Sequence, residues 1–127
     1  MSRERALKIA MIAAGSLFSA GIYPLVMSLW YWRRSDDVVP MFLSIYVTLG
    51  VFLLIAARNP APHRSLISFA AWSSFAHAMV MLVQACRDVA GRPELFVMSA
   101  VLLAIGVLLT ALAPPKRCQE LTEAHAH

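Results

Sequence analysis

Four long apolar runs, separated by short charged or proline-rich breaks, constrain the fold of this chain more than any other feature. The runs cover residues 9–32, 38–57, 66–86 and 95–113. An α-helix needs about 20 apolar residues to cross the hydrocarbon core of a bilayer. We therefore expect an all-α integral membrane protein, a bundle of four transmembrane helices connected up-down-up-down, with residues 1–127 forming a single membrane domain.

The composition argues against an ordinary soluble domain. Of the 127 residues, 60% are hydrophobic and only 14% are charged, whereas soluble domains have about 45–50% apolar and about 25% charged residues. The net charge of +4 comes from Lys and Arg in short clusters between the apolar runs. That spacing is typical of topology-setting loops and not of a basic binding face. We expect membrane lipids as partners and no nucleic acid.

The first two runs carry their own boundary signals. The first ends in Trp30-Tyr31-Trp32 followed by two arginines, an aromatic belt typical of a membrane interface. It is too long for the apolar segment of a signal peptide, which has about 7–15 residues, so we expect a retained helix. Pro24 should kink this helix. Pro40 suits the first turn of the second helix, where Gly50 allows close approach of a neighbour.

A short break at Arg58–Arg64 with two prolines predicts a turn, so the flanking helices should be antiparallel neighbours. Ser65 is a candidate N-cap for the third helix. Pro93 and Glu94 suit the first turn of the fourth helix, and Pro114-Pro115 should end it. The small-residue pairs Gly15/Ser19 and Gly106/Thr110 are signals of helix contact.

An even number of spans places both termini on one side of the membrane. Seven of the 11 Lys and Arg residues fall on that side, which predicts that both termini and the tail 114–127 are cytoplasmic. They are Arg3, Arg5, Lys8, Arg58, Arg64, Lys116 and Arg117. The same topology places Cys86 and Cys118 on opposite sides, so they should not form a disulfide.

His77 is the one histidine within the four apolar runs. It follows Ser65 by twelve residues, about 18 Å along a helix, which is close to the bilayer midplane. Ser73, His77, Met81 and Gln84 form one stripe on the helix. A polar stripe in lipid should face the bundle interior, because every polar group there needs a partner.

The expected partners of His77 are hydroxyl groups on the preceding helices. Ser44 and Thr48 are candidates on the second helix, and Ser16, Ser19 and Tyr23 on the first. Two interpretations stay open. The imidazole could fix helix packing through a hydrogen bond to one of these groups, or it could serve a proton relay, a ligand or a cofactor.

The sequence gives little support for an enzyme, a cofactor site or a metal site. The four runs contain no Asp, Glu, Lys or Arg, so no acid can orient His77 toward Ser73 or Ser74, and we expect no enzyme activity and no catalytic residue. A bis-histidine haem needs a second imidazole at membrane depth, and we expect no cofactor. His125 and His127 lie in the tail without the roughly four ligands of a structural metal site, so we expect no metal.

The stretch from Tyr46 to Met81 contains a YVTLG start, an AARNP turn and a WSS…H pattern in the third run. In these motifs the chain resembles a group of small bacterial four-helix membrane proteins known only as a domain of unknown function. The resemblance implies a bacterial inner-membrane location and the helix count. A looser likeness to DoxX-like membrane proteins rests on size and span count, which is analogy at the level of fold.

Two functional classes follow from these observations. The first is a non-enzymatic inner-membrane protein that acts by helix association, as a homo-oligomer or as an accessory subunit of a membrane-protein partner. The second is a small carrier or channel for a proton or small ligand, with a candidate site made of His77 and its polar neighbours. The residues of that site are Tyr23, Ser44, Thr48, Ser73, His77, Met81 and Gln84.

Overall fold

The computed structural model describes residues 2–31, 38–87, 92–115 and 123–126. Across these ranges the regular structure is helical, so the all-α prediction is confirmed. The elements are α1 (Arg3–Ala20), α2 (Ile22–Trp30), α3 (Val38–Ala56), the 3-10 turn η1 (Ala61–His63), α4 (Arg64–Arg87) and α5 (Arg92–Leu112).

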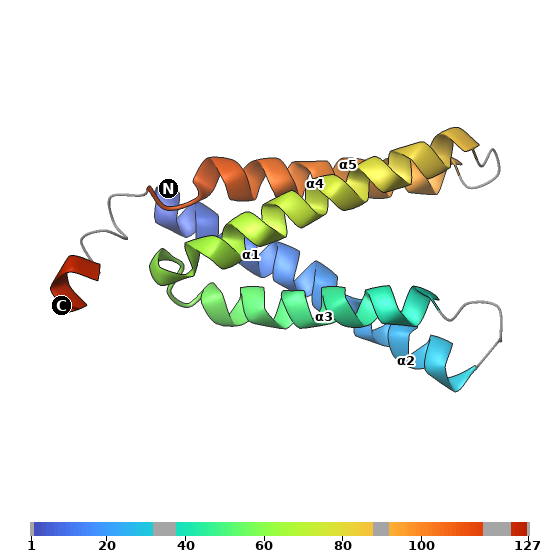
Figure 1. Cartoon of the computed structure of the whole chain (residues 1–127), viewed down its shortest axis with the longest axis horizontal. Helices are drawn as coiled ribbons and strands as arrows, with labels where there is room; N and C mark the ends of the chain where they lie inside the picture. Colours follow the sequence, from blue (N-terminus) through green and yellow to red (C-terminus); the bar gives the residue numbers. More distant parts are fainter. Residues whose placement is uncertain (1, 32–37, 88–91, 116–122, 127) are drawn as a thin grey trace.

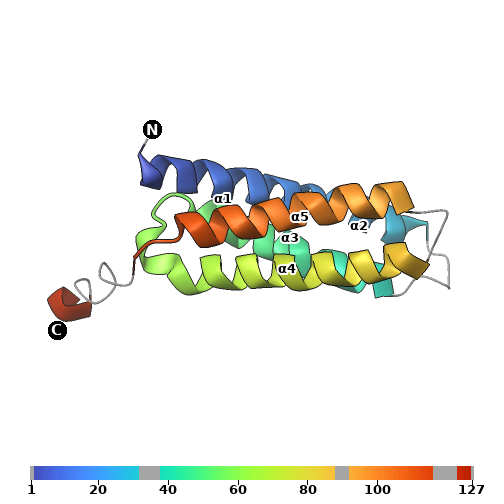
Figure 2. The same cartoon turned by 90° about the horizontal axis from the view of Figure 1, so that it is seen from above.

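The helices alternate in direction along the bundle. The pair α1 and α2 leads away from the end that holds the N-terminus, α3 returns, α4 leads away again and α5 returns (Figure 1). The closest packing is between α4 and α5 and between α1 and α3, while α1 also contacts α5 and α2 contacts α3. In the view from above, α5 lies in projection between α1 and α4, and α3 lies behind it (Figure 2).

The break at Arg58–Arg64 does turn the chain, but α3 and α4 are not close neighbours along their length. They converge at this turn and diverge toward the opposite end (Figure 1). Each of the two helices packs mainly against another partner, α3 against α1 and α4 against α5. The short connection therefore fixes their antiparallel direction without fixing their contact.

The first apolar run is divided into two helices. Ser2 caps α1, because its hydroxyl accepts a hydrogen bond from the backbone N–H of Arg5 at 3.3 Å. The helix therefore begins at Arg3, ahead of the apolar run itself. It is interrupted at Gly21, one turn before Pro24. Pro24 has no N–H to donate to the carbonyl of Ala20, so the interruption falls where this proline removes a bond.

The start of α4 corrects one prediction. Ser65 is not the N-cap, because α4 already includes Arg64 and follows directly after the 3-10 turn η1. Pro60 precedes that turn in a helical backbone conformation and so begins the winding earlier than the serine. The first turn of α5 contains Glu94 as predicted, and the helix ends at Leu112, before Pro114.

The core is built on small residues that let helix backbones approach. A Cβ atom added to Gly50 on α3 would lie 2.7 Å from the backbone nitrogen of Ser19 and 2.8 Å from the carbonyl oxygen of Gly15, both on α1. A Cβ added to Gly106 on α5 would lie 2.7 Å from the ring of Phe75 on α4. The predictions of close approach at Gly50 and of contact at Gly15/Ser19 are confirmed.

The outward faces of the helices remain apolar. Within the part of the chain that the structure describes, three segments are long and apolar enough to cross a membrane, namely Arg3–Trp30, Ala61–Arg87 and Pro93–Leu112. The apolar helix over Pro40–Ala56 is shorter. Trp30 and Tyr31, from the predicted aromatic belt, are 80% and 67% exposed. These features indicate a membrane protein with three clear candidate spans, and a fourth span is not established by them.

Candidate functional site

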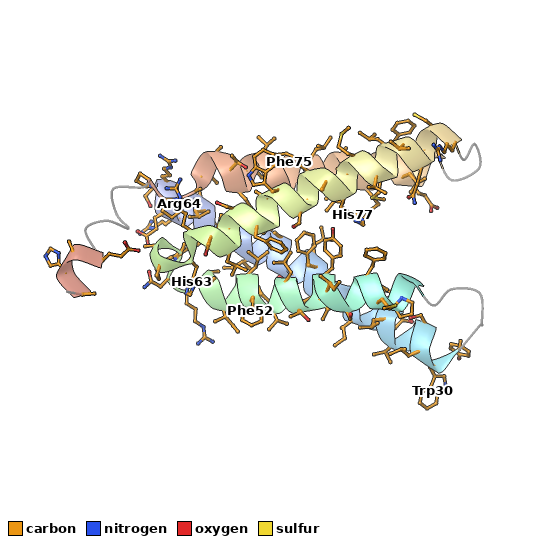
Figure 3. The ribbon with its side chains drawn as sticks, in the orientation of Figure 1. Trp30, Phe52, His63, Arg64, Phe75 and His77 are labelled. Atoms are coloured by element: carbon orange, nitrogen blue, oxygen red, sulfur yellow. The ribbon has the colours of Figure 1, made fainter. Side chains whose placement is uncertain are left out.

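His77 lies on α4, half-buried, on the side of the helix that faces α3 (Figure 3). Its ring meets the ring of Tyr46 on α3 edge to face, with a centroid distance of 4.9 Å and an angle of 66°. Tyr46 in turn meets Phe18 on α1 at 5.3 Å and 69°. A row of three rings therefore crosses the bundle from α4 through α3 to α1, and it joins the two helix pairs where they diverge.

Tyr46 was not among the predicted partners of His77, although the sequence contains a signal for it. Counted outward from Ala61 in the turn, Tyr46 lies fifteen residues before and His77 sixteen residues after. An antiparallel hairpin places such residues at the same depth. Ser44 and Thr48 lie at similar depth, but each is two residues from Tyr46 along the helix and so does not point in the same direction as its ring.

The predicted hydroxyl groups bond within their own helices. The hydroxyl of Ser44 donates to the carbonyl of Met41 at 2.7 Å, and that of Thr48 donates to the carbonyl of Ser44 at 2.8 Å. Ser73 donates to the carbonyl of Ala70 at 3.1 Å. Such bonds to the preceding turn satisfy a hydroxyl without any partner helix.

The remaining predicted site residues are spread over the bundle. Ser73 and Met81 are half-buried on α4 like His77, whereas Gln84 near the end of that helix is exposed. Tyr23 on α2 is 71% exposed. Ser19, another predicted partner, has a buried hydroxyl without a hydrogen-bond partner in the described structure, beside Gly50. The imidazole of His77 makes no hydrogen bond with any described residue, and its contact is the ring of Tyr46.

An apolar groove of about 330 Å³ lies between α3 and the first turns of α4. Two predicted site residues, Ser44 and Thr48, line it, and His77 does not. Its other walls are apolar and include Leu49, Phe52, Leu66 and Phe69. Phe52 and Phe69 are 55% and 60% exposed, so the groove opens to the surroundings of the bundle.

Two arginines hold the C-terminal end of α5. Nη2 of Arg3 donates to the carbonyls of Ala111 at 3.0 Å and Ala113 at 3.1 Å. Nη1 of Arg64 donates to the carbonyl of Pro114. The last carbonyls of a helix have no partner within it, and cationic donors there also complement the helix dipole. From the sequence, both arginines were interpreted only as signals of topology, because their distance from α5 along the chain does not indicate this contact.

A second cavity, of about 390 Å³, lies at this same end of the bundle. It is lined by Arg3, Glu4, Leu7, Asn59, Leu112 and Pro114, among others. Glu4 pairs with Lys8 at 2.9 Å. This cavity combines an arginine with apolar side chains from α1 and α5, a combination that no motif in the sequence indicated.

Two further predictions concern a metal site and a disulfide. Among the residues that the structure describes, no group of three or more His, Cys, Asp or Glu side chains is placed to hold a metal ion. Cys86 is an exposed free thiol at the end of α4, whereas Cys118 and His127 lie outside the described residues. The prediction about a disulfide therefore stays a prediction.

Residues 2–124 match the Family of unknown function (DUF6632). The chain belongs to this family. The match includes all the helices from α1 to α5, so it confirms the predicted membership of an uncharacterised family. No similar protein was found among curated proteins or among solved structures. The likeness to DoxX-like proteins and the bacterial origin stay predictions.

Proposed function

We propose that this member of the DUF6632 family is a non-enzymatic protein of the bacterial inner membrane that acts by helix association, as a homo-oligomer or as an accessory subunit. The observation that supports it best is the apolar groove between α3 and the first turns of α4, at which Phe52 and Phe69 are 55% and 60% exposed. Helix association in lipid depends on van der Waals packing between surfaces that fit, and a groove between two helices provides such a surface.

The proposal includes four spans with both termini cytoplasmic. The helix α3 has 19 residues, or about 28 Å at 1.5 Å per residue, which approaches the roughly 30 Å of the hydrocarbon core. The basic residues Arg3, Arg5, Lys8, Arg58 and Arg64 all belong to segments at the end that holds the N-terminus (Figure 1). This distribution supports a cytoplasmic location of that end.

The test is the stoichiometry of the full-length protein in lipid nanodiscs, measured by native mass spectrometry. We expect a homo-oligomer for the wild type and a shift toward monomer for Thr48→Trp, which fills the groove with an indole. The matched control is Leu108→Trp, which adds the same ring on α5 at a residue that is 49% exposed and outside the groove. A stable complex with a different protein that Thr48→Trp abolishes would favour the accessory subunit. A monomer without any partner would contradict both forms.

A second function rests on a separate observation, the imidazole of His77 without a hydrogen bond to any described residue. Ionisable groups at membrane depth are normally paired, so a proton or small ligand that binds this imidazole would supply the missing partner. Proteoliposomes with an internal pH dye test this carrier function. Proton flux that His77→Ala abolishes, with unchanged folding, would support it, and equal flux in both proteins would exclude His77 from it.

A further inference from the structure

The cavity at the N-terminal end of the bundle combines charge with apolar walls. It lies where α1 begins, where the turn after α3 passes and where α5 ends, and these three segments lie together in Figure 1. Arg3 and Asn59 supply polar groups, while Leu7 and Leu112 supply apolar surface from the two helices. Such a composition suits a ligand with an anionic head and an apolar body.

Arg3 keeps donors available for a ligand. Its Nη2 atom binds the carbonyls of Ala111 and Ala113. A guanidinium has five N–H donors in a planar fork, so Nη1 and Nε remain for a second partner. The N–H groups of Nη1 and Nε can each donate singly to a phosphate oxygen, the guanidinium keeps its positive charge, and the contacts to α5 hold it in place beforehand.

The charge at this end favours an anion. Arg5, Lys8, Arg58 and Arg64 accompany Arg3, and Glu4 is the one acidic residue in segments 2–8 and 57–65. Glu4 lies in the cavity wall, but its carboxylate is paired with Lys8 at 2.9 Å. The local field is therefore positive, and it is partly reduced by a single carboxylate whose removal can be tested.

We propose that this cavity binds the phosphate of an anionic phospholipid headgroup, with Arg3 as the principal contact. The lipid's acyl chains then run along the apolar faces of α1 and α5. The inference rests on the proposed membrane insertion, because only an inserted bundle places this end of α1 and α5 at headgroup level. Basic pockets between helices at the cytoplasmic side of a membrane are suited to such headgroups.

The test is native mass spectrometry of the purified full chain in detergent micelles, with equal amounts of phosphatidylglycerol and phosphatidylcholine added. We expect preferential retention of phosphatidylglycerol. Arg3→Gln should lower its affinity about tenfold, the effect of one lost charge-assisted contact. Arg87→Gln, which removes a cation at the opposite end of the bundle, is the matched control and should change the affinity little.

A second variant separates binding from folding, because Arg3→Gln also removes the contacts to α5. Glu4→Gln removes the negative charge from the cavity wall and should raise the affinity for phosphatidylglycerol about threefold. Equal retention of the two lipids, or equal losses in Arg3→Gln and Arg87→Gln, would overturn the proposal. So would displacement of the lipid by inorganic phosphate at matched concentration, since that outcome assigns the cavity to a soluble phosphate compound.

A separate experiment distinguishes a protein that does not insert into the membrane from an inserted protein that lacks the headgroup site. Alkaline carbonate extraction of membranes from expressing cells reports on insertion alone. Release of the protein into the supernatant contradicts insertion, and the headgroup site with it. Retention in the pellet together with equal binding of both lipids contradicts only the headgroup site.

Discussion

The interface between α1 and α3 and the interface between α3 and α4 differ in the size of their side chains. At the first, Gly15 and Ser19 face Gly50 so closely that no Cβ fits on Gly50. At the second, Phe52 and Phe69 stand at an open groove, and Tyr46 and His77 touch through their rings. Small residues allow backbones to approach, so their positions and not the length of the connection determine which helices pack.

The largest effect is expected from Gly50→Ala. The added Cβ would lie 2.7 and 2.8 Å from backbone atoms of α1, which cannot rotate away as a side chain can. Separation of α1 and α3 should lower the free energy of unfolding by about 1–3 kcal/mol, measured by titration with SDS in mixed micelles. Gly106→Ala is the control, because its new Cβ meets the ring of Phe75, which can turn, and its loss should be smaller. Equal losses would contradict the comparison.

The sequence predicted the helices better than their partners. Apolar runs, prolines and small residues are local signals, and they located α3 to within one residue at its end, the break before Pro24 and the close approach at Gly50. The start of α4 was misplaced because Ser65 resembles an N-cap, whereas Pro60 begins the winding earlier. A local pattern contains no information about which helix a face will meet.

The contacts of the candidate site were likewise not predictable from local sequence patterns. The sequence singled out His77 as a polar residue within an apolar run, and the structure places it half-buried on α4. Its ring partner Tyr46 follows only from hairpin depth combined with the face of α3. The arginine contacts to α5 join residues 108 and 50 positions apart in the sequence, so spacing could not reveal them. Arg3 and Arg64 were interpreted from the sequence as signals of topology, and both also bind carbonyl groups at the end of α5.

The next effect is expected at the end of the bundle where α4 begins and α5 ends (Figure 1). Arg64→Ala should lower the free energy of unfolding by about 1–2 kcal/mol, because the carbonyl of Pro114 loses a charged donor at a half-buried position. Arg58→Ala is the matched control, an exposed arginine in the same turn whose loss should matter less. If the two variants lose equal stability, net charge and not the contact with α5 is responsible, and the arginine cap would be the wrong account.

A smaller effect is expected where the two helix pairs touch through rings. Tyr46→Ala should cost about 1 kcal/mol, since it removes contacts to both Phe18 and His77. His77→Phe keeps a ring opposite Tyr46 and should cost less than half of that if His77 acts through packing. The same SDS titration measures both. A larger loss for His77→Phe than for Tyr46→Ala would show that the imidazole nitrogens contribute through a partner that the ring contact does not explain.

The smallest effect is expected in the groove itself. Thr48→Leu adds apolar volume between α3 and α4, and the hydroxyl that it removes bonds only to the carbonyl of Ser44 in its own helix. Because Thr48 is exposed, the free energy of unfolding of the monomer should change by less than about 0.5 kcal/mol. The control is Leu49→Ala, one residue away but 7% exposed, which should be clearly destabilising. A large loss in Thr48→Leu would mean that α3 and α4 close on each other in the membrane, and the open groove would then no longer support association.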